Sequence, residues 1–272
     1  MSGGPASPYR PSPYPSRERE GGRTPRILIV AGSDSGGGAG IQADIKTVTM
    51  LGGHAMTAVT AITAQNTLGV QAVHAVPVDM VLAQIDSVLG DIGADAVKIG
   101  MIGSAETAQA VADRLAGLDV PIVFDPVMIA TSGSVLADAA TIAAFSRLMA
   151  LARVVTPNLP ELAALGGREA VLGFGCHLAE KGGHAEGAMV VDRLWSPAGP
   201  EREVRGERID TTSTHGTGCT FATALATGLG AGLAMGDAFE RAVGFVRRAL
   251  IAAPGLGQGH GPMGQQFVTD YQ

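Results

Sequence analysis

From Arg26 onward the sequence alternates short apolar runs with longer amphipathic stretches, and this alternation restricts the fold more than any other feature. The apolar runs are continuous, as in parallel strands that are covered on both faces. The amphipathic stretches are long enough for helices that pack on such a sheet. The pattern predicts an α/β fold with one doubly wound, mostly parallel sheet between two layers of helices.

The expected strands and helices follow one another along most of the chain. Buried strands are predicted at 26–32, 54–63, 95–100, 121–127 and 153–158. Helices are predicted at 41–52, 78–92, 217–232 and 236–252, and others are expected to begin near Ala105, Ala137 and Leu159. Segments 71–77, 188–195 and 202–209 are expected at the edges of the sheet, the last two as a hairpin.

The two ends of the chain differ in composition from the middle. Residues 1–25 are rich in proline and have few apolar side chains, which is typical of a disordered tail. We therefore expect one folded domain at 26–255, preceded by this tail and followed by a short C-terminal tail at 256–272.

Charge and cysteine content exclude several functional classes. The net charge is −6 and only 16% of residues are charged, which disfavours nucleic acid as a partner. No apolar run reaches the length of a membrane span, and no signal-peptide pattern opens the chain, so neither a membrane partner nor export is expected. Cys176 and Cys219 lack the spacing of a zinc site, and a reducing cytoplasm is the expected location.

A glycine-rich loop, 32–40, follows the first predicted strand and opens a helix. Such a loop lets a ligand approach the backbone, although tight packing is the alternative explanation. It lacks the Lys and Ser/Thr of a phosphate-binding P-loop and the GxGxxG pattern of dinucleotide sites. No acidic residue follows the second strand, which ends in Ala64-Gln65-Asn66. A dinucleotide-dependent oxidoreductase is therefore the weakest hypothesis.

A second loop, Thr214-His215-Gly216-Thr217-Gly218-Cys219, opens an Ala-rich helix. The backbone N–H groups of a first helical turn have no partner within the helix, and the helix dipole adds positive potential there. This arrangement can hold a phosphoryl group as it is transferred. The same field is expected to ease deprotonation of Cys219, which could then accept a proton from a substrate hydroxyl. The alternative is a small cysteine that packs in the core.

Polar residues also follow two of the later strands, and a lysine lies beside a later turn. Asn158 and Glu161 have the spacing of a capping box, and they could also orient hydrated Mg²⁺ beside nucleotide phosphates. Asp125 ends another strand and could join them or merely cap a turn. Lys181 could contact a phosphate, although a solvated lysine beside a turn is the commoner case.

These loops, in this order, resemble the hydroxymethylpyrimidine/phosphomethylpyrimidine kinases of thiamine biosynthesis, within the ribokinase-like superfamily. The resemblance runs from about Arg26 to Ala253, and its most specific strings are AGSDSGGGAGIQADIKT, TAITAQNTLGVQ, VKIGMIG, DPVM, TPNLPE, KGGH and THGTGC. It implies a three-layer α/β/α domain and a homodimeric enzyme that uses ATP and Mg²⁺. It also implies that 4-amino-5-hydroxymethyl-2-methylpyrimidine is phosphorylated first, and its monophosphate second.

The resemblance also assigns roles to individual residues. Gln65 matches the residue that recognises the aminopyrimidine, and its amide can both donate and accept. Other residues around the pyrimidine are Gly32, Ala39, Asp44, Met101 and Val127. The anion hole and catalytic base correspond to Gly216, Thr217, Gly218 and Cys219. Nucleotide contacts are expected from Lys181, Thr214 and Asn158, and metal contacts from Asp125 and Glu161.

Two alternatives to this function stay open. Pyridoxal kinases share the GTGC-like turn, so vitamin B6 phosphorylation is the nearest rival. The interval 166–180 is shorter than the helix and apolar strand that family members have before the KGGH turn, so Lys181 is at risk of missing its phosphate. A pyrimidine sensor without nucleotide turnover would explain that shortening. All kinase hypotheses require Gln65 and Cys219 to face one cleft.

Overall fold

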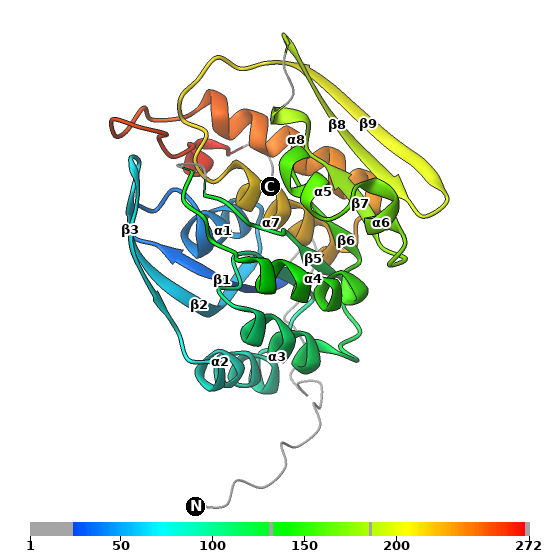
Figure 1. The fold of residues 1–272 in the computed structure, drawn as a ribbon. Helices are drawn as coiled ribbons and strands as arrows, with labels where there is room; N and C mark the ends of the chain where they lie inside the picture. The colour runs from blue at the N-terminus through cyan, green and yellow to red at the C-terminus, as the bar shows by residue number, and fades with distance from the viewer. Residues whose placement is uncertain (1–23, 131–132, 185–186, 270–272) are drawn as a thin grey trace, which may run out of the picture.

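The computed structural model describes residues 24–130, 133–184 and 187–269 (Figure 1). A nine-stranded sheet runs through this part of the chain in the order β3-β2-β1-β4-β5-β6-β7-β8-β9. Strands β1, β2 and β4–β7 pair in parallel, and β3, β8 and β9 pair antiparallel. The doubly wound α/β architecture expected from the alternating pattern is confirmed.

Outside the interval 166–180, the strands and helices lie close to the predicted segments. The strands are β1 (Arg26–Asp34), β2 (His54–Asn66), β3 (Gly69–Ala75), β4 (Ala96–Ile99), β5 (Ile122–Phe124), β6 (Val154–Val155), β7 (His177–Glu180), β8 (Met189–Ser196) and β9 (Gly199–Glu207). The helices are α1 (Gly40–Met50), α2 (Val78–Asp91), α3 (Ala105–Leu115), α4 (Ala139–Leu151), α5 (Leu159–Ala164), α6 (Arg168–Leu172), α7 (Thr217–Gly230) and α8 (Met235–Ile251).

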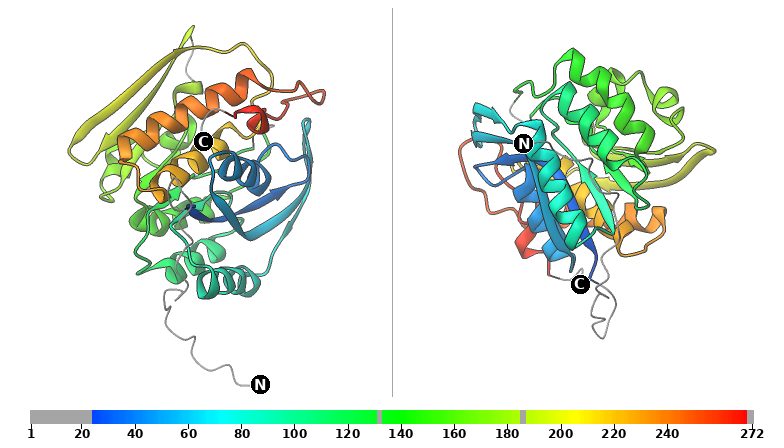
Figure 2. Two further views of the ribbon diagram at one scale, coloured as in Figure 1. Left: turned by 180° about the vertical axis from the view of Figure 1, so that it is seen from behind. Right: turned by 90° about the horizontal axis from the view of Figure 1, so that it is seen from below.

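Both faces of the sheet are covered, which explains the continuous apolar runs. In β1, Leu28 and Val30 pack on one face with residues of α2, α3 and α4, whereas Ile27 and Ile29 pack on the other with residues of α7 and α8. All four side chains are fully buried. The two views of Figure 2 show the helical layers on opposite sides of the sheet. Burial on both faces removes the need for polar residues within the central strands.

The topology fixes where a ligand can bind. Strand β1 has β2 on one side and β4 on the other, so the connection from β1 to β2 runs one way across the sheet and the connection from β3 to β4 runs back the other way. In an open α/β sheet, a crevice forms at such a reversal, outside the carboxyl ends of the strands. The loops that follow β1, β2, β4, β5, β6 and β7 all begin at this edge.

The interval 166–180 retains the strand that the sequence analysis expected to be reduced. Residues His177–Glu180 form β7, which pairs in parallel with β6 and antiparallel with β8. The preceding helix α6 is short, with 5 residues. Because β7 is in place, Lys181 leaves the sheet at the same edge as Asp125 and lines the pocket there, so the shortening of 166–180 does not remove this lysine from the site.

The two predicted tails, 1–25 and 256–272, differ in what the structure describes of them. The predicted N-terminal tail, 1–25, falls almost entirely outside the described residues. At the other end, Met263, Gln265 and Val268 are buried, and the Gln265 amide donates to Thr220 Oγ1 on α7 at 3.0 Å. The part of 256–272 that the structure describes therefore packs against the helix that carries Cys219.

Candidate functional site

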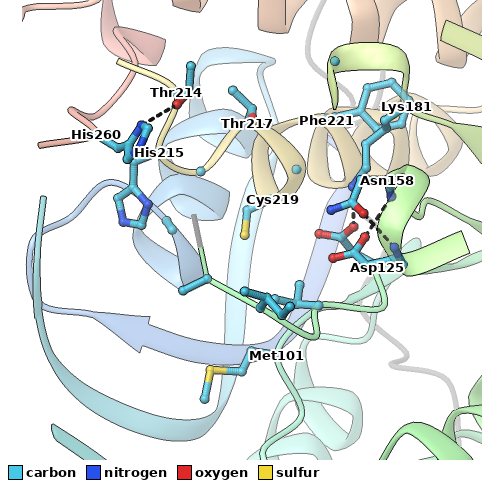
Figure 3. Close-up of a pocket in the computed structure, with 18 of the residues that line it drawn as sticks. Met101, Asp125, Asn158, Lys181, Thr214, His215, Thr217, Cys219, Phe221 and His260 are labelled. Atoms are coloured by element: carbon cyan, nitrogen blue, oxygen red, sulfur yellow. Dashed lines mark hydrogen bonds and ion pairs between the residues drawn. The ribbon is translucent and has the colours of Figure 1, made fainter. Parts of the chain in front are cut away.

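A pocket of about 840 Å³ opens at the carboxyl edge of the sheet. Its walls come from the loops after the parallel strands and from the first turn of α7. Figure 3 shows Cys219 between His215 on one side and the Asp125–Lys181 pair on the other. A cavity of this size can hold a small ring and a nucleotide together.

The pocket brings together all but one of the predicted site residues. Gln65 and Cys219 both line it, as the kinase hypotheses require. The other predicted residues on its wall are Gly32, Ala39, Met101, Asp125, Val127, Asn158, Glu161, Lys181, Thr214, Gly216, Thr217 and Gly218.

Asp44 is the exception, and its expected contact with the pyrimidine needs correction. Its side chain is fully buried in α1, where Oδ2 accepts from Lys98 Nζ at 2.8 Å and Oδ1 accepts from Thr223 Oγ1 at 2.6 Å. Lys98 is also fully buried. Asp44 is therefore used to hold α1, β4 and α7 together below the pocket. The sequence analysis missed Lys98, although a lysine within an apolar strand was a signal for such a pair.

The first turn of α7 forms the anion-binding part of the pocket. Gly216 is the N-cap residue, with φ of 84°, and no side chain caps the helix. The first N–H groups of the helix therefore lack a side-chain acceptor from the cap, and the helix dipole makes this end attractive to an anion. A β-carbon at Gly218 would lie 3.1 Å from Lys181 Nζ, so the missing side chain leaves room beside the lysine.

Gly216 allows close packing that another residue would prevent. A β-carbon there would lie 1.9 Å from the Gly38 carbonyl oxygen, whereas one at Gly232, with φ of 88°, would meet nothing within 4 Å. We expect Gly232→Ala to lower the free energy of unfolding by about 1 kcal/mol through backbone strain alone. Gly216→Ala should lose about 2 kcal/mol more because of overpacking. Urea unfolding of both variants checks this, and equal losses would contradict the packing argument.

The thiol of Cys219 is less acidic than the sequence analysis expected. Burial raises the pKa of Cys219 to about 11, and the Asp44 and Asp125 carboxylates add to that rise. The nearby Lys98 ammonium lowers the pKa in part, but does not compensate. The prediction of easier deprotonation at the helix terminus is therefore wrong for the ligand-free protein, because desolvation by burial disfavours the thiolate.

On one side of Cys219, the side chains of Asp34, His215 and Gln65 form a polar group. Asp34 Oδ2 is 2.8 Å from His215 Nε2, and His215 Nε2 is 3.1 Å from the Gln65 amide. Asp34 and His215 are both buried. Neither was predicted as a site residue, although both lie within strings that carried the resemblance. A lone histidine or aspartate in a glycine-rich loop gives no sign of its partner, which here is 181 residues away.

At the opposite end, Lys181 and two carboxylates form a charged cluster. Lys181 Nζ donates to Asp125 Oδ1 at 2.8 Å, and Thr156 Oγ1 donates to the same oxygen at 2.9 Å. Burial raises the pKa of Glu161, and Lys181 opposes this rise. Asn158 and Glu161 form the predicted capping box at α5, with both bonds at 2.8 Å. The cap and the pocket wall are thus built from the same two residues.

None of the helices in the described part of the chain combines the length and the apolar character that a membrane span requires.

Comparison with known proteins places these features in a family. Residues 34–264 match the profile of phosphomethylpyrimidine kinase. The hydroxymethylpyrimidine/phosphomethylpyrimidine kinase of Streptomyces coelicolor is 46% identical over 88% of this chain and 93% of its own length. Some relatives are longer: the chain spans 53% of the thiamine biosynthesis bifunctional protein of Geobacter sulfurreducens, with 46% identity.

Solved structures show the same fold. A Bacillus subtilis pyridoxal kinase in complex with ADP has a TM-score of 0.81 and 31% identity, covering 89% of this chain and 98% of that chain. The phosphomethylpyrimidine kinase of Clostridium difficile has a TM-score of 0.71 and 33% identity, covering 84% and 99%. The sheet is thus that of the ribokinase-like vitamin kinases, and the chain belongs to the phosphomethylpyrimidine kinase family.

Proposed function

We propose that the protein phosphorylates 4-amino-5-hydroxymethyl-2-methylpyrimidine on its hydroxymethyl group and then phosphorylates the monophosphate to the diphosphate. The observation that carries this proposal is that Gln65, Cys219 and Lys181 line one cavity, with the first turn of α7 between the two ends. Relatives that carry the names of both activities cover nearly the whole domain. The product would serve thiamine biosynthesis.

The pyrimidine is placed at the end of the pocket that Gln65 lines. An amide can donate to a ring nitrogen and accept from an adjacent amino group. Met101 and Val127 line the pocket and give the ring apolar contacts. The backbone at Gly32 and Ala39 allows close approach, and a β-carbon at Gly32 would lie 3.0 Å from Met101 Sδ.

ATP is placed at the other end, as the phosphoryl donor. The side chains of Val243, Val246 and Leu250 line the pocket and offer an apolar surface for a purine ring. Lys181, Thr214 and Asn158 would contact the phosphates. A pyridoxal kinase of the same fold was solved in complex with ADP, which supports a nucleotide as a ligand of this fold.

The residues near Lys181 also fit a magnesium ion. Asp125 and Glu161 offer carboxylate oxygens, the ligands that Mg²⁺ prefers. In the described part of the chain no three His, Cys, Asp or Glu side chains converge as a metal site. The ion would therefore depend on water and nucleotide oxygens for most of its coordination, as Mg²⁺ in kinases does. When bound, it would neutralise charge on the phosphates during transfer.

The chemistry follows from these positions. The hydroxymethyl oxygen attacks the γ-phosphorus, the bond from that phosphorus to the bridging oxygen of ADP breaks, and the hydroxyl proton passes to the thiolate form of Cys219, which becomes the neutral thiol. The N-terminal turn of α7 stabilises the negative charge of the group in transit. Alignment of the two reactants in one dry pocket accounts for much of the acceleration.

A coupled assay of ADP release tests the proposal, run in parallel with hydroxymethylpyrimidine, its monophosphate and pyridoxal. We expect turnover of the first two above the rate without acceptor. Pyridoxal is included because the pyridoxal kinase has the higher TM-score of the two solved structures above. Turnover of pyridoxal alone would reassign the enzyme, and ADP release equal to the blank with all three would overturn the kinase function. Tight binding of hydroxymethylpyrimidine without ATP binding would instead indicate a sensor.

Two further properties belong to the proposal because the family resemblance implies them. We expect a homodimer, and the exposed apolar side chains of Ile62 and Val73 on β2 and β3 are compatible with an interface there. We also expect a cytoplasmic location, where both cysteines stay reduced.

A further inference from the structure

The main chain at Gln65 is held by hydrogen bonds on both sides, so the open question is which way its side-chain amide is turned. Gln65 lies at a register shift between β2 and β3. The Ser35 hydroxyl accepts from the Gln65 N–H at 2.8 Å and donates to the Gln65 carbonyl at 2.9 Å. The nitrogen and oxygen of the amide exchange places when the group rotates by half a turn, so neighbouring donors and acceptors decide its orientation.

The first restriction on the amide comes from Asp34. Its carboxylate accepts from the N–H groups of Gly36, Gly38 and Ala39 at 2.8–2.9 Å. Burial alone would raise the pKa of Asp34, but these bonds and the bond from His215 together lower it. An ionised carboxylate only accepts hydrogen bonds. His215 Nε2, at 2.8 Å from Asp34 Oδ2, must therefore carry a hydrogen, and it cannot accept one from Gln65.

The second restriction comes from Thr63, on the other side of the amide. Thr63 Oγ1 donates to the Ser33 carbonyl at 2.9 Å and also lies 3.2 Å from the Oε1 position of Gln65. A hydroxyl has one hydrogen, which is directed at Ser33. Thr63 therefore offers Gln65 an acceptor. The single Nε2 hydrogen of His215 lies between Asp34 Oδ2 at 2.8 Å and the Gln65 amide at 3.1 Å, and Gln65 can share it only as an acceptor in a three-centre bond.

Both restrictions require the same orientation. The Nε2 position of Gln65 is 3.1 Å from His215 Nε2, where two donors would face each other. We propose that the amide is turned so that its oxygen accepts from His215 Nε2–H and its nitrogen donates to Thr63, and that Asp34 and His215 are the positioning residues that set pyrimidine specificity. This inference rests on the proposed function, because it deepens the role of Gln65.

A fixed amide distinguishes two edges of a pyrimidine. The 4-amino compound presents a donor beside an acceptor, whereas its 4-oxo analogue presents an acceptor beside a donor. An amide that turns freely can match either edge, but one held by His215 and Thr63 matches one only. Specificity against the analogue arises because the wrong edge leaves polar groups unpaired. The pair formed by Asp34 and His215 would thus select the aminopyrimidine without touching it.

The tautomer of His215 tests the orientation without any substrate. In protein with ¹⁵N-labelled histidine, long-range nitrogen–proton correlation spectra distinguish a hydrogen on Nε2 from one on Nδ1. We expect His215 to carry a hydrogen on Nε2, and His215→Gln identifies its signal by loss. A neutral His215 with its hydrogen on Nδ1 alone would overturn the inference, whether or not the protein is a kinase.

The specificity itself is tested by calorimetry with the 4-amino and 4-oxo compounds. We expect the unaltered protein to bind the 4-amino compound about 100-fold more tightly, since two hydrogen bonds would be mismatched in the analogue. His215→Leu, which cannot donate, should reduce this ratio to about tenfold or less. His215→Gln, which retains a donor, should restore most of it. His54→Leu, at an exposed histidine where β2 begins, should leave it unchanged.

If His215→Leu fails to fold, Thr63→Val still tests the inference, because it removes the other restraint on the Gln65 amide with little change of side-chain shape. It should lower the same ratio while the affinity for the 4-amino compound changes less. An undiminished ratio in both His215→Leu and Thr63→Val would overturn the inference while the kinase function stands. Absence of ADP release with every acceptor would defeat the kinase function, and the His215 tautomer would still decide the orientation.

Discussion

Replacing Cys219 with alanine should lower kcat for phosphorylation of hydroxymethylpyrimidine by about 10²–10⁴-fold, the usual contribution of a positioned general base. The same change should affect the second phosphorylation much less. The acceptor in that step is a phosphate monoester, whose second pKa near 6 leaves it ionised at neutral pH. It needs no base. Rates of ADP release with the two acceptors, measured on one preparation, give both effects.

The pH dependence provides a second measure of the same residue. Because the pKa of the Cys219 thiol is raised to about 11, only a small fraction is thiolate at neutral pH. If the thiolate is the base, kcat/KM for hydroxymethylpyrimidine should rise about tenfold per pH unit from pH 6 toward pH 10. In Cys219→Ala this rise should disappear.

Cys176 supplies the matched control for both measurements. It is buried, its thiol pKa is also raised to about 11 by burial, and its Sγ contacts the Val171 carbonyl at 3.4 Å. It does not line the pocket. We expect Cys176→Ala to keep kcat for both acceptors and the slope with pH. Equal losses of the first and second activities in Cys219→Ala would argue against a base and for a role in packing of α7.

The sequence was most informative about which loops reach the pocket, because this follows from the order of strands and helices along the chain. A strand that ends at the carboxyl edge of a parallel sheet delivers the next loop to the pocket, so Gln65 and Asp125 could be placed at one edge from the alternation of strands and helices. Cys219 follows the antiparallel strand β9, and the family resemblance placed it in the same cleft. The strand at 177–180 escaped prediction because it has only 4 residues and includes His177 and Glu180. Its backbone pairing with β6 and β8 stabilises the strand, although its own composition does not favour one.

Side-chain ionisation could not be predicted in the same way. The acidity of Cys219 depends on its depth in the pocket and on Asp44 and Asp125, which are distant in sequence. Likewise, Asp44 resembles a pyrimidine ligand by position, but Lys98 holds it below the pocket. Helix termini and loop sequences indicate which residues are near a site, whereas burial and long-range pairing decide which of them reach the ligand.

Lys98→Met should destabilise the protein more than any other single change considered above. Lys98 and Asp44 are both fully buried and form an ion pair at 2.8 Å. Burial alone would lower the pKa of Lys98, but the carboxylates of Asp44 and Asp125 raise it, so the ammonium is retained in the fold. Removing it leaves a buried carboxylate without a countercharge. We expect the free energy of unfolding to fall by about 3–5 kcal/mol in urea titrations.

The pH dependence of this loss follows from Asp44. Burial raises the pKa of Asp44, and Lys98 opposes that rise, so Lys98→Met should raise it further. A carboxyl group whose pKa is raised by folding costs no stability below its unfolded pKa, where it is protonated in both states. Its cost to the free energy of unfolding grows as the pH rises from the unfolded pKa toward the folded one. The deficit of Lys98→Met relative to the unaltered protein should therefore be smallest near pH 4 and increase toward neutral pH.

Two variants separate the loss of a charge from the loss of packing. The double variant Lys98→Met with Asp44→Leu removes both buried charges, and it should recover most of the stability, because an apolar pair of similar volume replaces a buried ion pair with little penalty. Arg147→Met breaks the exposed pair with Asp113 and should change stability little. A double variant as unstable as Lys98→Met would mean that packing at these two positions, rather than an unpaired buried charge, accounts for the loss.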